Sequence, residues 1–259
     1  MKKISGGAEH VVALTSNGFV YTWGSRGTQG QLGRRFAPRI VDWRKEGLLP
    51  RRVANLRGIA DVWTGSSHSF AVDAKEGTVY SWGINNAGQT GVDENMGEYG
   101  GAVDMPTPVA SLRDYYGRIV QMAGGEFHTL ALTTEGECLA WGRLYSFATG
   151  TKFDSLPEGF IIRDERGKPS ILRTPTVVED GDFPTPLSFI AAAGEHSLAV
   201  AADGSVYSWG LNLSNQIGQG DEEEIKTPTR VKGKSIREKQ IVWVGTGAQY
   251  SMLGELRDR

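Results

Sequence analysis

The sequence predicts an all-β protein built as a β-propeller. Three observations point to this class: a recurring Trp-Gly dipeptide, a histidine in register with each copy of it, and a high glycine content of 35 in 259 residues. The usual glycine share is about 7%, so the chain is rich in turns. Short strands at even spacing with periodic glycine and aromatic marks are typical of propeller blades. The four dipeptides begin at Trp23, Trp82, Trp141 and Trp209.

Each copy has an apolar strand that begins at a histidine, such as residues 10–15, and a Gly-x-x-His turn precedes the strand in the first copy. All four histidines of the chain stand at the strand start: His10, His68, His128 and His196. The strand leads into a glycine turn, Asn17-Gly18 in the first copy, and such pairs join hairpin strands because both residues tolerate positive φ. A second strand follows in which Tyr21 and Trp23 are two residues apart and therefore share one face.

The remainder of each copy supplies two more strands. A glycine follows each tryptophan after nine or ten residues, at Gly33, Gly91, Gly150 and Gly218. Next comes a Pro-x-x-Val segment such as Pro106–Val109, which predicts an edge strand because proline has no N–H to donate. An apolar strand such as 119–124 leads into the next copy. A β-solenoid would require a shorter period of about 20–30 residues.

Four strands per copy predict four full blades and a partial fifth within one propeller domain that covers residues 1–259. We expect the repeats at 4–58, 59–118, 119–188 and 189–240, and the partial one at 241–254. No segment shows sustained helical periodicity.

Composition excludes several classes of protein. Lys and Arg number 28 against 30 Asp and Glu, for a net charge of -2, so bulk charge does not favour general nucleic-acid binding. The apolar share is 39% and no run approaches a membrane span, so no membrane partner is expected. The N-terminus lacks the apolar stretch of a signal peptide. Cys138, the single cysteine, excludes an internal disulfide, fits a reducing compartment and is expected to be inert core.

The combination of Gly-x-x-His, Gly-x-Val-Tyr-x-Trp-Gly and Gly-Gln-Leu-Gly resembles the repeat of the regulator of chromosome condensation family. It is visible in residues 5–34 and less completely in 65–91, 124–150 and 194–218. Three irregular features resemble the fungal form of the family's chromatin-bound exchange factor for the small GTPase Ran. They are Gln31–Arg34 with the basic insertion behind it, the connector 164–176, and the ending 244–251.

The resemblance implies a seven-bladed ring in the family. The chain therefore resembles the C-terminal part of such a protein, and we expect it to be incomplete by about three blades. Open ends of this kind would present unpaired strand edges.

The resemblance also implies a function: a guanine nucleotide exchange factor for Ran, without covalent chemistry and therefore not an enzyme. Such a factor weakens GDP and GTP binding by negative coupling, because it binds the GTPase most tightly without nucleotide. It implies nuclear, chromatin-associated localisation, with some cytoplasmic presence, and roles in nucleocytoplasmic transport and the cell cycle. The alternative is a non-catalytic propeller scaffold. No cofactor or small-molecule substrate is expected, and no catalytic constellation favours a hydrolase or metalloenzyme.

Three residues of the first two repeats are candidates for GTPase contact by this resemblance. Glu9 stands where the family has an aspartate implicated in exchange, although a solvated turn acid is an equal alternative. Arg34 matches a basic family position near the same rim, or is an ordinary solvated arginine. Asn86 lies in the loop after Trp82-Gly83, where an Asx-type turn is the favoured alternative.

The later repeats add four candidates for GTPase contact: Glu126, Phe127, His128 and Tyr250. Family members carry paired histidines at 127–128, of which the first contributes to Ran affinity, and here Phe127 replaces it. Tyr250 likewise replaces a histidine that some members use. Aromatic side chains are good interface anchors, so contact can survive both replacements.

The insertion 34–53 carries seven basic residues against Asp42 and Glu46. In the family, a loop at this place reaches the acidic patch of core histones on the nucleosome, and arginine forks suit clustered carboxylates. The histone-binding candidates are Arg39, Trp43, Arg44 and Lys45. An ordinary solvated loop is the alternative for each of them.

The four histidines are the most obvious candidates for metal ligands in the sequence. They fall one per repeat rather than at zinc-ligand spacing, so a structural role at the strand start is favoured and no metal site is predicted. His-Ser pairs such as His68-Ser69 recur with the repeat, and no third orienting group accompanies them.

Overall fold

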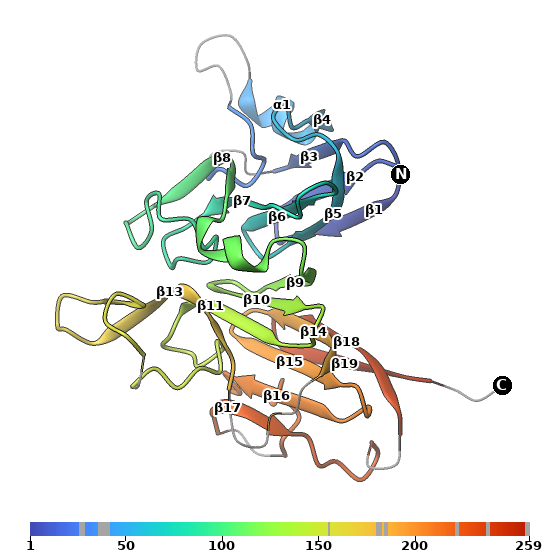
Figure 1. Ribbon diagram of the computed structural model, residues 1–259, viewed down its shortest axis with the longest axis vertical. Helices are drawn as coiled ribbons and strands as arrows, with labels where there is room; N and C mark the ends of the chain where they lie inside the picture. The colour runs from blue at the N-terminus through green and yellow to red at the C-terminus, as the bar shows by residue number, and fades with distance from the viewer. Residues whose placement is uncertain are drawn as a thin grey trace. The chain divides into compact units, whose positions relative to one another are not determined.

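The computed structural model describes residues 1–25, 29–35, 42–154, 156–179, 183, 186–220, 223–236 and 239–256. Its regular structure is almost entirely β, which confirms the predicted fold class. The chain divides into two compact units, Met1–Arg118 and Ile119–Arg259 (Figure 1). The division coincides with the junction expected between the second and third repeats.

The first unit contains two four-stranded antiparallel sheets, each a meander in chain order (Figure 1). The first sheet comprises β1 (Lys3–Gly6), β2 (His10–Leu14), β3 (Val20–Gly24) and β4 (Arg51–Arg52). The second comprises β5 (Ile59–Thr64), β6 (His68–Asp73), β7 (Val79–Ile84) and β8 (Ala102–Pro108). Two short helices interrupt the pattern, α1 (Trp43–Leu48) in the basic insertion and a 3-10 helix at Ala110–Tyr115.

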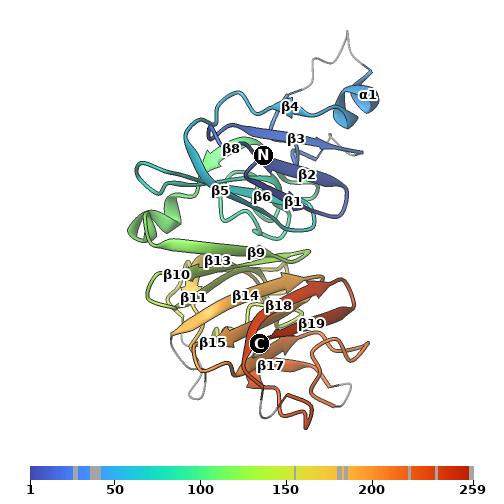
Figure 2. The ribbon, with the colours of Figure 1, turned by 90° about the vertical axis from the view of Figure 1, so that its right-hand side faces the viewer.

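The second unit contains three sheets. One has five strands in the order β12-β13-β11-β10-β9, the next runs β14-β15-β16-β17, and β18 pairs with β19. Their bounds are β9 (Ile119–Gly124), β10 (His128–Thr133), β11 (Cys138–Arg143), β12 (Ile161–Arg163), β13 (Pro169–Val177), β14 (Leu187–Ala193), β15 (His196–Ala201), β16 (Val206–Gly210), β17 (Ile225–Arg230), β18 (Ile241–Gly247) and β19 (Tyr250–Glu255). Strand β14 lies next to both β9 and β18, so the first strands of the three sheets line up (Figure 2).

The glycine turns between second and third strands form as expected, but with one positive φ rather than two. In the first copy, the Gly18 N–H donates to Thr15 O at 3.0 Å and the Thr15 N–H donates to Phe19 O at 2.9 Å. Gly18 has φ +73°, while Asn17 is not left-handed. The turn is therefore a longer loop that ends in a glycine bulge, and only the glycine position requires a residue without Cβ.

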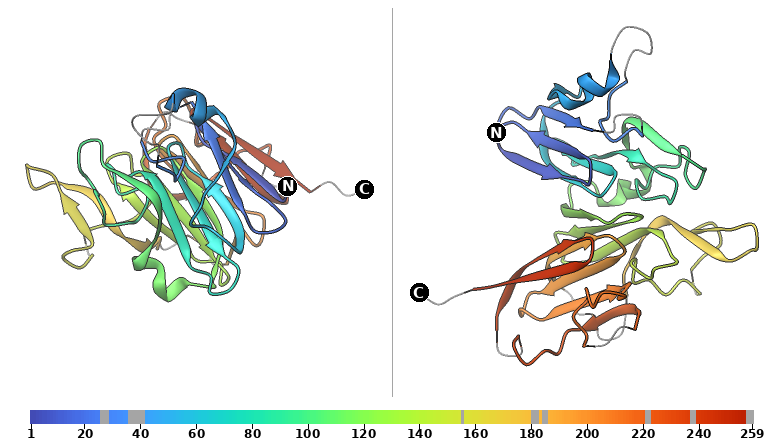
Figure 3. Two further views of the ribbon diagram at one scale, coloured as in Figure 1. Left: turned by 90° about the horizontal axis from the view of Figure 1, so that it is seen from above. Right: turned by 180° about the vertical axis from the view of Figure 1, so that it is seen from behind.

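The Pro-x-x-Val strands lie at the outer edge of their sheets except in the third repeat. There the connector folds back as β12 and adds a fifth strand outside β13, visible as the yellow hairpin in Figure 3. The pairing joins Ile161–Arg163 to Pro169–Leu172. Pro175 lies beyond this stretch, so its missing N–H costs no hydrogen bond to β12.

The core lies between successive sheets of each unit. Trp82 packs with Val12, Val20 and Val53 of the preceding sheet. Cys138 is buried as expected, and burial raises the pKa of its thiol to about 12. Within the described residues, none of the helices has the length and apolar character needed to cross a membrane.

Candidate functional site

The turn before each repeat histidine, Gly-x-x-His in three copies and Ala193-Gly-Glu-His in the fourth, lies at the same end of its sheet as the loop that follows Trp-Gly. Register shows this directly, because His10 pairs with Gly24 and His196 pairs with Gly210. We call this end of each sheet its turn end. The candidate contact residues come from these turns and loops, so each unit presents its own set.

The turn itself is fixed by two glycines that leave no room for a side chain. A Cβ on Gly125 would lie 2.4 Å from Nδ1 of His128, so the ring stacks directly on the glycine. A Cβ on Gly142, the glycine of Trp-Gly, would lie 2.4 Å from Phe127 O. Both contacts are far shorter than packed atoms allow, which explains why glycine follows every repeat tryptophan and stands three residues before the histidine in three of the four copies, with Ala193 at that place in the fourth.

The rings of His10, His128 and His196 each connect neighbouring sheets of one unit and do not face solvent. His128 is 1% exposed and its Nε2 lies 2.8 Å from Ser197 Oγ on the next sheet. The Ser197 hydroxyl donates to Ala148 O at 2.8 Å, so Nε2 must carry the proton and donate to it. His10 and His196 bond Ser69 and Ser251 in the same way, at 2.8 and 3.2 Å.

Burial keeps these rings neutral. It lowers the pKa of His128 to about 3, with a smaller effect of nearby His196, and it lowers the pKa of His10 and of His196 to about 4. No group of His, Cys, Asp or Glu in the described part of the chain is arranged to hold a metal ion.

His128 therefore has to be corrected as a contact candidate, because a buried ring bonded to Ser197 cannot meet a partner at the surface. Its neighbours can: Glu126 is exposed and Phe127 is half-buried. The Arg143 guanidinium stacks over the Phe127 ring at 3.4 Å and lies 3.8 Å from a carboxylate oxygen of Glu195.

Arg143 and Glu195 were not predicted from the sequence. The position of Glu195 could have been noticed, because it directly precedes His196 as Glu9 precedes His10. Arg143 could not, since its stacking on Phe127 depends on β11 lying beside β10.

Tyr250 takes the histidine place in the last sheet. A Cβ on Gly247 would lie 2.3 Å from its ring, the same close stacking that the histidines show. Tyr250 differs in being 57% exposed, so it remains available to a partner.

In the first unit, Glu9 lies exposed in the turn before β2, and its backbone oxygen accepts a hydrogen bond from the Ser25 N–H at 3.0 Å. Asn86 accepts a hydrogen bond from Gln89 Nε2 at 3.3 Å, which fits the local-turn alternative. The neighbouring Asn85 is fully buried and donates to Val92 O and Glu94 O, both at 2.7 Å.

Arg34 holds the basic insertion against the sheet. Its Nη2 lies 3.2 Å from both Glu46 O and Leu49 O, in and beside α1, and 3.4 Å from Thr22 O on β3. Partial burial lowers the pKa of the guanidinium, with smaller effects of Glu46 and Arg51. These hydrogen bonds indicate that Arg34 stabilises the packing of α1 against β3.

The histone-binding candidates are only partly visible. Arg39 lies outside the described residues, and the backbone of Trp43 and Arg44 belongs to α1 while their side chains are not described. Lys45 is exposed, with its Nζ 3.8 Å from Asp42 Oδ2.

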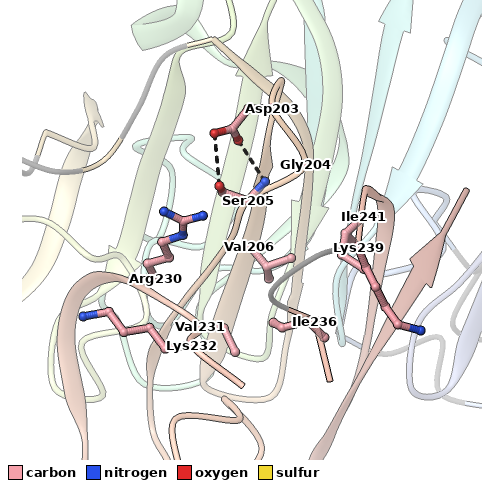
Figure 4. Close-up of a pocket in the computed structure, with 10 residues that line it drawn as sticks. All are labelled: Asp203, Gly204, Ser205, Val206, Arg230, Val231, Lys232, Ile236, Lys239 and Ile241. Carbon is pink, nitrogen blue, oxygen red and sulfur yellow. Dashed lines mark hydrogen bonds between the residues drawn. The ribbon is translucent and has the colours of Figure 1, made fainter. Parts of the chain in front are cut away.

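A cavity of about 370 Å³ lies at the other end of the fourth sheet, beside the Asp203-Gly204 turn. Its cations do not converge: Figure 4 shows Lys232 and Lys239 extending in opposite directions, and Lys239 pairs with Glu255 at 2.5 Å. The Asp203 carboxylate accepts from the Ser205 N–H at 2.8 Å and from its hydroxyl at 3.1 Å (Figure 4). These contacts close the turn and form no catalytic arrangement.

Comparison with known proteins gives consistent relatives. The chain is 41% identical over 252 residues to Protein pim1 of Schizosaccharomyces pombe, covering 97% of this chain and 44% of that protein. It is 34% identical to Guanine nucleotide exchange factor SRM1 of Saccharomyces cerevisiae, covering 98% and 50%. It is 30% identical to the Regulator of chromosome condensation of Xenopus laevis, covering 97% and 56%. The chain thus spans about half the length of these relatives.

Solved structures agree. The crystal structure of Prp20p from Saccharomyces cerevisiae, described with its binding properties to Gsp1p and histones, superimposes with a TM-score of 0.88 at 34% identity, over 99% of this chain and 56% of that one. The structure of Kap60 bound to yeast RCC1 (Prp20) gives 0.87 at 33% identity, over 99% and 54%. The RCC1-like domain family matches residues 1–253. The chain belongs to this family, and its sheets are blades of a β-propeller of the RCC1 type.

Proposed function

We propose that the chain acts in guanine nucleotide exchange on a Ran-type GTPase, as an exchange factor or as part of one. The relatives support this: SRM1 is named a guanine nucleotide exchange factor, and Prp20p is described as binding Gsp1p and histones. The activity needs no covalent chemistry from the chain. It needs a rigid surface that prefers the nucleotide-free GTPase.

The observation that carries the proposal is a set of solvent-accessible side chains at the turn ends, on turns fixed by a ring stacked on a glycine. Glu9 in the first unit, and Glu126, Phe127 and Tyr250 in the second, stand on turns whose own histidine or tyrosine is stacked on glycine. Side chains on short loops held by a rigid scaffold are suited to recognition because little order is lost on binding.

The chemistry of an exposed carboxylate suits exchange. GTPases hold nucleotide phosphates with a lysine and a magnesium ion. A carboxylate such as Glu9, presented at that site, competes with the phosphates for the same cations. Binding of the propeller surface and binding of the nucleotide then oppose each other, and each weakens the other by the same factor.

The basic insertion supplies a second proposed contact, with histones. Lys45 on α1 is the candidate whose side chain the structure describes, and Arg34 anchors the helix to β3. A chromatin contact would place the protein in the nucleus.

The test is release of fluorescent GDP from purified Ran, with an unrelated small GTPase as control. We expect the chain to accelerate release from Ran alone, and Glu9→Ala to reduce the acceleration about tenfold. Glu76→Ala is the matched control, because Glu76 is an exposed acid of the same unit in the turn between β6 and β7, at the other end of its sheet.

Three results separate the outcomes. Faster release that depends on Glu9 but not on Glu76 supports the proposal. Binding to nucleotide-free Ran without faster release would restrict the chain to docking. A folded chain that neither binds Ran nor releases GDP would overturn the proposal in favour of a scaffold for another partner.

A further inference from the structure

The β12–β13 hairpin projects beyond the turn end of the third sheet. Arg143, the last residue of β11, pairs with Ile171, and on the other side of β13 Ile171 pairs with Ile162. Residues 163–170 therefore lie past the end of β11, at the end where His128 pairs with Gly142. Figure 1 shows this segment as the yellow element that reaches out past β10 and β11. The hairpin has no counterpart in the other sheets, so it is not part of the repeat.

The tip of the hairpin, Asp164–Lys168, is a defined turn organised by one carboxylate. Asp164 Oδ1 accepts hydrogen bonds from the backbone N–H of Arg166 at 2.9 Å and of Lys168 at 2.8 Å. The Asp164 N–H donates to Lys168 O at 2.9 Å, and the Gly167 N–H donates to Asp164 O at 2.9 Å. Gly167 has φ +75°, the left-handed residue that closes a three-residue hairpin loop. The tip therefore presents its side chains from a fixed backbone.

The loop that follows β11 fastens this tip to the sheet. The Leu144 N–H donates to Ser170 O at 2.9 Å, and the Tyr145 hydroxyl donates to Asp164 Oδ2 at 2.8 Å. The second bond raises the pKa of Tyr145 and lowers the pKa of Asp164, as expected when a hydroxyl donates to an ionised carboxylate. Removing the Tyr145 hydroxyl would release the tip from this loop and leave the hydrogen bonds within the turn in place.

The hairpin and the turn that carries Glu126 belong to one sheet. The strand order is β12-β13-β11-β10-β9, so β13 is two strands away from β10, about 10 Å at the usual spacing. Arg143 joins the two places, since its side chain stacks on Phe127 while its backbone pairs with Ile171. A partner that contacts about 800 Å² of the protein, the usual size of an interface, covers both.

The charges of the hairpin favour an acidic partner surface. Its exposed charged residues are Arg163, Glu165, Arg166 and Lys168. The Asp164 carboxylate already accepts three hydrogen bonds, so positive charge prevails at the tip. A lysine and a magnesium ion hold the nucleotide in a GTPase, and they would repel these cations. The surface that suits the hairpin therefore lies outside the nucleotide site.

We propose that the β12–β13 hairpin is a recognition arm that binds an acidic patch on the GTPase, beside the nucleotide site. Arg166 and Lys168 make the contact, and Tyr145 positions them through Asp164. A cavity of about 320 Å³ between Tyr145 and the tip is the place where an acidic side chain of the GTPase enters. The inference rests on the proposed exchange function. Because the contact is the same with and without nucleotide, it increases affinity and does not change the release step.

The test measures GDP release over a range of concentrations of GDP-loaded Ran, so that KM and kcat are obtained separately. Arg166→Ala combined with Lys168→Ala removes both cations and keeps the backbone N–H groups that bond Asp164. KM should rise about fivefold, the loss expected for two exposed ion pairs, and kcat should stay unchanged. Lys232→Ala combined with Lys234→Ala is the matched control, because these are exposed cations of the same unit beyond β17, at the other end of the fourth sheet.

Three further measurements separate the charge of the arm from its position. Arg166→Lys combined with Lys168→Arg keeps both charges and should keep the wild-type KM. Tyr145→Phe removes no charge but should raise KM about threefold, the effect of one lost hydrogen bond. Raising the salt concentration from about 50 mM to about 300 mM should raise the wild-type KM more than that of the double alanine variant, because salt screens the contact. Melting curves check the fold of each variant, which exposed substitutions should leave unchanged.

Several results would overturn the inference and leave the proposed function standing. They are a wild-type KM in the double alanine variant, an equal rise in the Lys232 and Lys234 control, and a fall in kcat, which would place the arm at the nucleotide site. Loss of nucleosome binding with an unchanged KM would assign the arm to chromatin instead. If the wild-type chain binds nucleotide-free Ran without releasing GDP, the dissociation constant of that complex replaces KM in each comparison. A folded wild-type chain that does neither overturns both the proposed function and the inference.

Discussion

Two residues of one turn, Glu126 and His128, differ completely in environment although they are two positions apart. His128 is 1% exposed, stacked on Gly125 and bonded to the next sheet, whereas Glu126 is exposed. His10, His68 and His196 are likewise buried, whereas Tyr250, which takes the histidine place in the last sheet, is 57% exposed. The repeat histidines belong to the packed interior, and the residues between them, which differ from copy to copy, are the candidates for contact with a partner.

The strongest test of this division is a pair of alanine substitutions in the second unit. His128→Ala removes the bond to Ser197, leaves a buried hydroxyl without that donor and opens a cavity, so we expect a loss of about 2–4 kcal/mol in unfolding free energy. Glu126→Ala should change it by less than about 0.5 kcal/mol. Urea unfolding followed by tryptophan fluorescence measures both. Equal losses would mean that the turn does not divide into a structural and an exposed side.

Acid pH should selectively destabilise the contacts that the buried histidine rings make. The folded pKa values of His10, His128 and His196 lie at about 3 to 4, below the ordinary value of 6.5, so the unfolded chain binds protons that the folded chain does not. Stability should therefore be constant above pH 7 and fall as the pH drops from 6.5 toward 4, by on the order of 1 kcal/mol per histidine at pH 5.5. Melting temperatures from pH 8 to pH 5 test this.

The Asp73 carboxylate titrates outside that window. Partial burial raises its pKa, but the hydrogen bonds it accepts from the backbone N–H groups of Lys75, Glu76 and Thr78 outweigh that effect and hold the pKa below the ordinary value of 3.8, so the stability that Asp73 contributes is lost only at lower pH. A melting temperature that stays flat between pH 7 and pH 5 would show that the histidines are not buried as neutral rings.

The smallest effect on stability is expected on the exposed insertion. Arg44→Ala combined with Lys45→Ala removes two positive charges from α1, and exposed charges contribute little to folding, so unfolding should change by less than about 0.5 kcal/mol. Nucleosome binding should weaken while Ran binding is retained, as gel-shift and pull-down assays would report. Unchanged nucleosome affinity would remove the insertion from the proposed chromatin contact.

Much of the fold could be predicted from the sequence because each repeat residue makes a specific close contact in its sheet. The Gly-x-x-His and Trp-Gly pairs mark the two points where backbone and ring touch, and each strand start follows from them. The five-stranded third sheet was not foreseen, since the pairing of β12 with β13 involves a connector that has no counterpart in the other copies.

The candidate site was predictable in position but not in detail. Glu9, Glu126 and Tyr250 emerged at exposed turns, as expected of residues that precede or replace a repeat histidine. His128 was misassigned because a sequence position beside an exposed residue does not reveal which way a ring points. Arg34 illustrates the same difficulty, since its three carbonyl contacts come from segments that only the folded insertion brings together.

The carbonyl oxygen of Ala148 has a consequence for how the protein is made. It belongs to the loop of the third sheet, yet both of its donors, Ser197 and Trp209, come from the fourth, and Trp209 lies 61 residues further along the chain. That loop can close only after the following sheet has been synthesised. The ribosome makes the chain from the N-terminus. We therefore expect the sheets to fold in chain order, with each newly made sheet supplying the hydrogen bonds that complete the sheet before it.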